Sequence, residues 1–224
     1  MKNFSKLILT TVLILLPVSF VLFMSCNQDE MPTLTKQNQF DRPMLTLDTI
    51  HPGDFKTYGQ GAWGSPPHGN NPGQYLKNNW YRLDTVIIGC DTIGGKTLTF
   101  TSWQAANHFL PQGRKPAALD TSYINPNFKI TVLAGQQLAL ALNILFDLAD
   151  STFGNSPLHL KDLCVTTGTF QGWKVQQVFA EANKILGGCN SIYTASEING
   201  AVESINENFE GGEVVGNYLE ICSP

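Results

Sequence analysis

The sequence predicts a mainly α-helical domain with one small β-hairpin, an α+β fold in which a compact helical domain follows a loop rich in Gly, Pro and Asn. Three observations predict it. Apolar residues recur at helical spacing in three segments of the C-terminal half, two β-branched runs flank a Gly-Gly turn, and a Gly- and Pro-dense segment precedes them. A chain of 224 residues without internal repeats is the size of one domain with appendages.

The N-terminal segment predicts export. Lys2 and Lys6 precede an apolar run of 18 residues from Leu7 to Met24, which ends at Ser25-Cys26. A basic start followed by an apolar stretch is typical of a signal peptide. A small residue directly before a cysteine at the end of such a run resembles the lipobox of bacterial lipoproteins, in a looser form that occurs in the Bacteroidota. The resemblance implies a signal peptide over residues 1–25 and lipidation of Cys26.

An uncleaved transmembrane helix is the alternative interpretation of this leader, because 18 apolar residues are nearly enough to cross a bilayer. Pro17 and the hydroxyl residues of the run favour the lipoprotein. Both interpretations place the rest of the chain outside the cytoplasm. Acyl chains alone would hold the protein on the membrane.

Residues 26–56 read as the lipidated cysteine and a flexible tether, because they contain several prolines and no sustained periodicity. Asn27-Gln28-Asp29-Glu30 resembles the surface-export signal of Bacteroidota lipoproteins. These features predict a cell-envelope location in which the domain is lipid-anchored to the outer membrane and exposed at the cell surface.

A single globular domain is predicted over residues 57–224, and it begins with a turn-rich loop. Residues 57–73 hold five glycines and three prolines, a density that argues against any helix or strand there. The β-branched runs at residues 84–89 and 96–101 predict the hairpin. Thr101-Ser102 offers an N-cap for a short helix from Trp103 to Leu110 that Pro111 closes.

Three amphipathic helices complete the prediction. The segment from Gln136 to Asp150 is apolar over most of its surface and is expected to form the centre of the core. A second helix begins near Val175 and stops at Gly187-Gly188. A capping box of Thr194 with Glu197 starts the third, which continues to Phe209.

The cysteines predict two disulfides. Once Cys26 is set aside, Cys90, Cys164, Cys189 and Cys222 remain, and an even number in an exported chain favours disulfides. Sequence alone does not select among the three pairings that four cysteines allow. We expect Cys164 to pair with Cys189, which closes a loop around one predicted helix, and Cys90 to pair with Cys222. Metal ligation is disfavoured because no C-x-x-C pair occurs and the histidines are scattered.

Several short motifs together resemble a domain that recurs in exported and surface proteins of diverse bacteria. The resemblance covers about three quarters of the chain and implies no activity, cofactor or catalytic residue. It is carried by Tyr58-x-Gln60-Gly61-x-Trp63-Gly64, Gly69-Asn70-Asn71-Pro72-Gly73, Leu98-Thr99, Phe109-Leu110-Pro111, Leu133-Ala134-Gly135-Gln136 and Ile205-Asn206-x-Asn208-Phe209.

Composition and motifs argue against common chemistries. Residues 27–224 hold 12 basic side chains (14 less the two of the leader) against 18 acidic ones, a net charge of −6 that disfavours nucleic-acid binding. Gly94-Gly95-Lys96-Thr97 departs from a phosphate-binding loop, because Cys90 stands where its first glycine belongs. No calcium loop accompanies the acidic C-terminal segment. No cofactor is expected.

Hydrolase chemistry is disfavoured because no nucleophile motif is present. His108 and His159 read as surface residues. The carboxylate pairs Asp147 with Asp150 and Glu203 with Glu207 read as solvated helix faces.

A cluster of aromatic residues remains as the candidate binding site. Flat rings beside amide side chains are common in glycan- and peptide-binding proteins, whereas rings that simply anchor a loop are the alternative. The candidates are Tyr58, Trp63, Tyr75, Trp80 and Tyr81. The sequence therefore favours a non-catalytic envelope lipoprotein that serves adhesion, envelope assembly or the binding of a glycan or protein ligand. A divergent glycan-processing hydrolase is the alternative.

Overall fold

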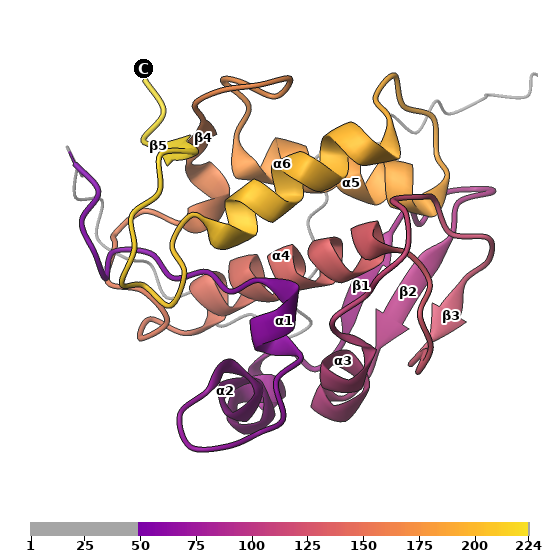
Figure 1. Ribbon diagram of the computed structural model, residues 1–224, viewed down its shortest axis with the longest axis horizontal. Coiled ribbons are helices and arrows are strands. Elements are labelled where there is room, and N and C mark those ends of the chain that lie inside the picture. The colour runs from indigo at the N-terminus through magenta and orange to yellow at the C-terminus, as the bar shows by residue number, and fades with distance from the viewer. Residues whose placement is uncertain (1–48, 224) are drawn as a thin grey trace, which may run out of the picture.

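A computed structural model describes residues 49–223 of the chain. The predicted signal peptide, Cys26 and the tether as far as residue 48 lie outside these described residues. Within them the predicted α+β class is confirmed (Figure 1). The elements are α1 (Gln60–Trp63), α2 (Pro72–Asn79), η1 (Trp80–Arg82), β1 (Val86–Gly89), β2 (Thr97–Phe100), α3 (Trp103–Phe109), β3 (Tyr123–Ile124), α4 (Val132–Ala149), η2 (Leu160–Asp162), β4 (Cys164–Val165), α5 (Val175–Gly187), α6 (Ala195–Glu207) and β5 (Leu219–Glu220).

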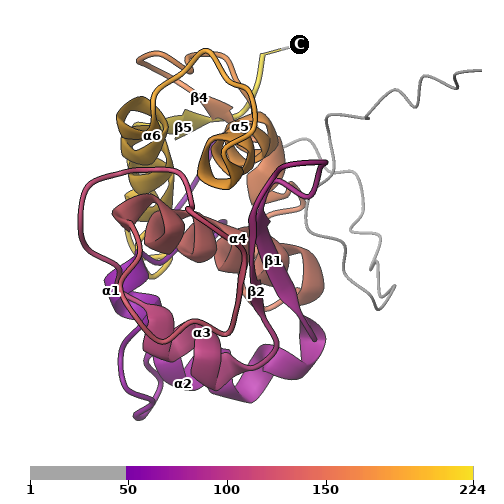
Figure 2. The same ribbon diagram turned by 90° about the vertical axis from the view of Figure 1, so that its right-hand side faces the viewer.

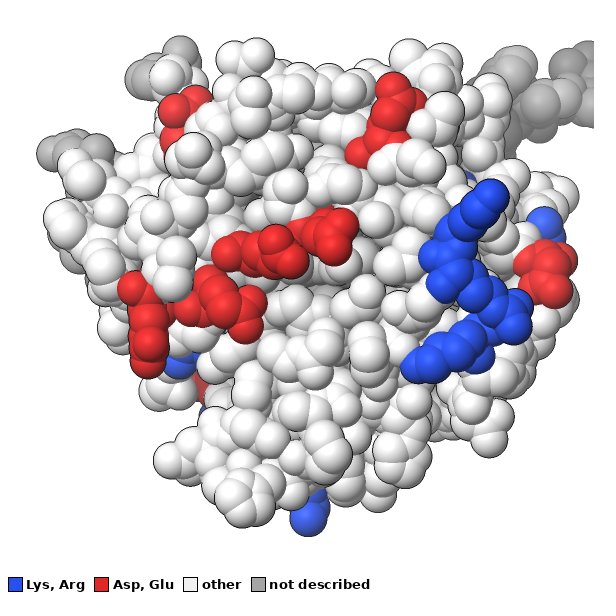
Figure 3. Space-filling view, in the orientation of Figure 1, with Lys and Arg blue, Asp and Glu red and all other residues white. Residues whose placement is uncertain are grey.

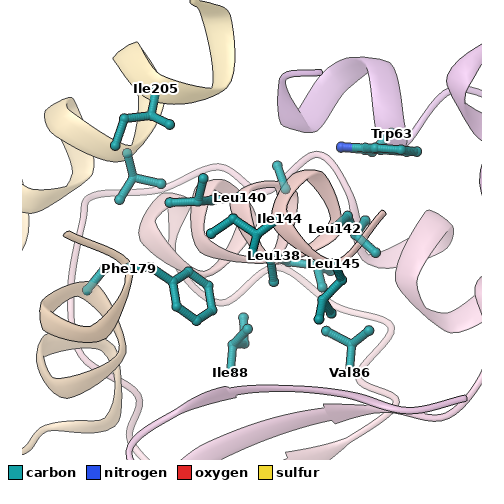
Figure 4. Packing of buried hydrophobic residues seen from close by; sticks show 14 of the residues in the cluster. Trp63, Val86, Ile88, Leu138, Leu140, Leu142, Ile144, Leu145, Phe179 and Ile205 are labelled. Carbon is teal, nitrogen blue, oxygen red and sulfur yellow. The ribbon is translucent and has the colours of Figure 1, made fainter. Parts of the chain in front are cut away.

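Helix α4 is the centre of the core, as its apolar sequence predicts. It contacts α5 and α6 on one side, α1 on another and β1 on a third (Figures 1 and 2). By length and composition α4 could cross a membrane, but it is buried inside the domain and therefore acts as a core helix. In Figure 4, Leu145 points toward Val86 of β1, and Leu140 points toward Ile205 of α6.

The predicted hairpin is confirmed and gains a third strand. β1 pairs antiparallel with β2, and β2 pairs parallel with β3, so Ile87, Thr99 and Ile124 form one row across the sheet. Val86 and Ile88 alternate with Ile87 and face the core. The sequence contains no signal for β3, since two residues are too few to produce a detectable alternation.

The residues predicted to cap or end helices do so. Ser102 caps α3, its Oγ accepting the N–H of Ala105 at 3.3 Å. The capping box of α6 forms, because the N–H of Glu197 donates to Thr194 Oγ1 and the N–H of Thr194 donates to Glu197 Oε2. α5 ends at Gly188, whose φ of 74° is in the left-handed region that glycine adopts readily.

Two predictions about the N-terminal part of the domain are wrong. The loop does contain helix: α1 forms one turn, and Asn71 caps α2 with Pro72 at its first position. The domain also begins before residue 57. Phe55 is buried against Phe209, with their ring centroids 5.1 Å apart, because the segment before the loop runs beside the segment after α6.

Two disulfides are present, as the cysteine count predicts, but the expected pairing is wrong. Cys90 pairs with Cys189, and Cys164 pairs with Cys222. The hairpin turn lies against the end of α5, where the N–H of Lys96 donates to the Gly187 carbonyl. β4 pairs with β5 near Cys222. The disulfides indicate an oxidising, extracytoplasmic compartment.

Candidate functional site

Three of the five predicted aromatic residues come together near the C-terminal half of α4. Tyr58, Trp63 and Tyr75 pack with Phe146 of α4 and with Phe153, which follows it. The Trp63 ring stacks on the rings of Phe146 and Phe153, with ring centroids 5.5 Å and 6.1 Å apart. The Tyr58 ring packs against Trp63 in a T-shaped arrangement, with centroids 5.1 Å apart. Trp63 is fully buried, whereas the two tyrosines are partly buried. The cluster therefore anchors the loop and offers no flat open ring.

The other two predicted aromatic residues lie on η1, apart from this cluster. Trp80 is buried, and its indole N–H donates to the Asp84 carbonyl at 3.2 Å. Trp63 and Trp80 are thus core side chains, which corrects their assignment to a ligand. Tyr81 is 65% exposed, and the Arg82 guanidinium lies 5.2 Å from its ring. Of the five, Tyr81 is the ring that a ligand could reach.

A buried asparagine holds this aromatic loop to α4. Asn143 Oδ1 accepts the main-chain N–H of Tyr58 and the indole N–H of Trp63, each at 3.0 Å. Its Nδ2 donates to the Tyr58 carbonyl and to Asn206 Oδ1, also at 3.0 Å. All four hydrogen bonds of the amide are made inside the core. Asn143 is therefore a structural residue that fixes the loop.

The same polar cluster extends to α6 and the start of α4. Asn206 Nδ2 donates to both the carbonyl and Oε1 of Gln136 at 3.0 Å. At Gly135 a Cβ atom would lie 2.0 Å from Gln60 Oε1, so the glycine lets the loop approach α4 closely. Parts of three of the short motifs meet here: Tyr58 and Gln60, Gly135-Gln136, and Asn206. Their contacts are structural.

The sequence shows only part of this cluster. Gln136 and Asn143 belong to a narrow polar stripe on an otherwise apolar helix. Such a stripe indicates that these side chains have hydrogen-bond partners inside the core. The sequence does not reveal that Asn206 and the loop main chain are those partners. The stripe also contains Asp147 and Asp150, which are predicted to be solvated and are in fact buried. That prediction is wrong because η2 covers Asp147, while Tyr75 of α2 and Arg82 of η1 cover Asp150.

Asp150 is held by neutral donors and one cation. Tyr75 Oη donates to its Oδ2 at 2.6 Å, the N–H and Oγ1 of Thr152 donate to its Oδ1, and Arg82 Nε lies 3.7 Å from Oδ2. Burial raises the pKa of Asp150, but these hydrogen bonds and the Arg82 charge outweigh it and lower the pKa. Burial and the same hydrogen bond strongly raise the pKa of Tyr75.

A second carboxylate pairs with a histidine. Asp147 Oδ2 lies 3.0 Å from Nδ1 of His159 and accepts the N–H of Leu160 at 3.0 Å. The imidazole is 23% exposed and the carboxylate 3%. Such a pair orients a general base in many hydrolases. Here the Leu160 hydrogen bond shows that Asp147 also fastens η2 to α4.

Among residues 49–223 no group of three or more His, Cys, Asp or Glu side chains is arranged to hold a metal ion. The carboxylate of Asp150 faces the Arg82 guanidinium and the Tyr75 phenol. These contacts hold α2 and η1 against the end of α4, which is a structural role.

No protein family, curated protein or solved structure matches this chain. The resemblance of its motifs to a domain of exported bacterial proteins stays a prediction. The roles of the site residues rest on their contacts and burial.

Proposed function

We propose that the protein is a non-catalytic lipoprotein of the cell envelope, anchored through Cys26 in the outer membrane, whose domain displays a rigid binding surface outside the cytoplasm. The leader and its final Ser25-Cys26 support the anchor. The two disulfides, which close loops with sequence separations of 99 and 58 residues, support an oxidising location.

One observation carries the non-catalytic assignment: the best candidate site consists of polar groups that already bind one another. Asn143 uses both amide atoms on the loop and α6, and Asp150 uses both oxygens on Tyr75 and Thr152. Catalytic groups need to reach a substrate. The geometry is that of a scaffold, in which buried polar contacts set the shape of the surface above them.

Radiolabelled palmitate tests the anchor. Wild-type protein is expected to take up the label and to fractionate with the outer membrane, whereas Cys26→Ala is expected to stay unlabelled and unprocessed. Ser25→Ala is the matched control, because it keeps a small residue before the cysteine. Equal labelling of wild type and Cys26→Ala would contradict the lipid anchor.

A binding screen tests the role of the domain. The mature polypeptide without lipid, residues 27–224, is applied to glycan arrays and to isolated envelope material. We expect the polypeptide to be retained on the array or envelope material at physiological ionic strength. Tyr81→Ala tests whether the exposed ring takes part, in which case the variant is retained less. Retention equal to that of a reduced and unfolded sample would contradict binding by the folded domain.

A glycan-processing hydrolase is the second candidate, and the His159–Asp147 pair is the observation that favours it. If the pair is a catalytic base, His159→Gln abolishes turnover of generic glycoside and ester substrates while the exposed His68→Gln leaves it intact. If the pair is structural, the wild type shows no turnover. In that case His159→Gln lowers only stability.

A further inference from the structure

The segment between α3 and α4 gathers the exposed positive charge of a domain that is otherwise acidic. Residues 49–223 contain ten Lys and Arg side chains, of which Lys77, Arg114, Lys115 and Lys129 are exposed. Three of these four belong to this one segment. Figure 3 shows basic side chains grouped on the right of the molecule, on the side of β3.

Hydrogen bonds hold the two arms of this segment together. Buried Gln112 accepts the N–H of Ile130 on its Oε1 at 2.7 Å, and its own N–H donates to Gln60 at 2.8 Å. Thr131 Oγ1 donates to the Lys115 carbonyl at 2.8 Å, and Lys129 Nζ donates to the Pro111 carbonyl. Arg114 and Lys115 are therefore fixed beside Lys129.

One exposed apolar side chain borders these charges. Phe128, next to Lys129, is 48% exposed and packs edge-on against Tyr123 at 5.1 Å. Ile124 on β3 is 73% exposed, but it lies on the outer face of the sheet in the row with Ile87 and Thr99, opposite the face of Tyr123. We call Arg114, Lys115, Lys129 and Phe128 the basic–apolar patch. Asp120 is the acidic residue of the same segment, and its carboxylate accepts the Tyr123 hydroxyl and the Thr121 N–H.

The acidic side chains lie mainly on another part of the surface. Figure 3 shows them over α6 and the segment that follows, where Glu207, Glu210 and Glu213 are exposed. The domain thus has one basic end and one acidic side. A negatively charged plane would orient it with the basic–apolar patch inward and α6 away from the plane.

We propose that the basic–apolar patch docks the domain on a membrane surface of anionic lipid headgroups. Basic side chains beside an exposed Phe are a composition that binds the boundary between headgroups and acyl chains. The proposal rests on the lipid anchor of the proposed function. Only 22 residues separate Cys26 from Thr49, a length that spans at most about 75 Å, so the anchored domain is held within reach of the bilayer.

Vesicle sedimentation tests the docking without the anchor. The mature polypeptide, residues 27–224, is mixed with vesicles of phosphatidylcholine alone or with phosphatidylglycerol added. We expect binding to the anionic vesicles only, weakened by salt. Arg114→Asn with Lys115→Gln is expected to lower the partition coefficient about 25-fold, since each basic side chain contributes about fivefold. Asparagine suits the left-handed backbone at Arg114, where φ is 71°.

Lys77→Gln with Lys174→Gln is the matched control, because it removes the same charge away from the patch. Its binding should equal that of the wild type. Phe128→Ser is expected to weaken binding at high salt as well as at low salt, because its contribution is apolar. Circular dichroism and disulfide mapping confirm that each variant is folded.

Three outcomes would overturn the docking proposal: equal binding to neutral and anionic vesicles, equal losses in the patch variant and its control, or retention on a soluble sulfated glycan without vesicle binding. Salt-sensitive self-association with no vesicle binding would also overturn it, in favour of the acidic side of a second copy. The anchor is tested separately by palmitate labelling. If the full-length chain takes up no palmitate while residues 27–224 still bind anionic vesicles, the proposed function is refuted and the docking surface stands.

Discussion

Replacing Asn143 by alanine tests whether the buried amide fixes the aromatic loop. The substitution leaves four groups without this partner inside the core: the Tyr58 N–H, the Tyr58 carbonyl, the Trp63 indole N–H and Asn206 Oδ1. Each unsatisfied buried group costs about 1–3 kcal/mol. With four such groups we expect the free energy of unfolding to fall by at least about 4 kcal/mol, a large share of the total of about 5–15 kcal/mol typical of a domain.

Urea unfolding followed by tryptophan fluorescence measures this change, because all four tryptophans, Trp63 of the loop among them, lie in the folded domain. Asn127→Ala is the control, since Asn127 is exposed, and should change the free energy of unfolding by less than about 0.5 kcal/mol. Asn206→Ala, alone and with Asn143→Ala, gives the coupling between the two amides, expected above about 0.5 kcal/mol. A loss below about 1 kcal/mol for Asn143→Ala would refute the reasoning, because it would be smaller than the cost expected for even one unsatisfied buried group.

Three further predictions follow from the structure. Gly187→Ala should destabilise the domain, since the added Cβ would lie 2.3 Å from the Cys90 nitrogen, whereas Gly200→Ala, with nothing within 4 Å, should raise the melting temperature in a thermal scan. Tyr75→Phe should lower the free energy of unfolding by about 1–3 kcal/mol near neutral pH. Because the folded state lowers the Asp150 pKa below 3.8, that contribution is present above this pH and lost as the pH falls through the folded pKa, so the difference between variant and wild type should shrink in acid. Replacing Cys164 and Cys222 by serine should cost about 2–5 kcal/mol, measured by urea unfolding; an unchanged midpoint would show that this disulfide does not constrain the unfolded chain.

The helices could be predicted from the sequence because their signals are local. The apolar period of α4, the capping box at Thr194 and the Gly187-Gly188 stop each depend on neighbouring residues. The hairpin was predictable for the same reason. These elements form where propensity, patterning and packing agree.

What the sequence could not predict depends on contacts between distant segments. The pairing of Cys90 with Cys189 follows from the hairpin turn lying on the end of α5, which no spacing rule reveals. Asp147 and Asp150, which the sequence predicts to be solvated, are buried because η2, α2 and η1 pack over them. A helical wheel identifies the polar stripe, but only the tertiary structure shows what faces it.

The aromatic site was predicted in part. The rings around Trp63 do gather, but they gather inward, because a Gly- and Pro-rich loop lacks regular hydrogen bonds and is held in place by buried rings and amides. The basic–apolar patch lies in a segment whose sequence shows no regular pattern. Its three basic side chains become one surface only when the two arms of the segment pair.

Mass spectrometry of the protein purified from its native envelope, digested without reduction, tests the central claim most directly. An exported lipoprotein with this fold should yield an acylated N-terminal peptide at Cys26 and two cross-linked peptide pairs, Cys90 with Cys189 and Cys164 with Cys222. Recovery of the full-length chain in the cytosol, with Cys26 unmodified and the other four cysteines as free thiols, would contradict it.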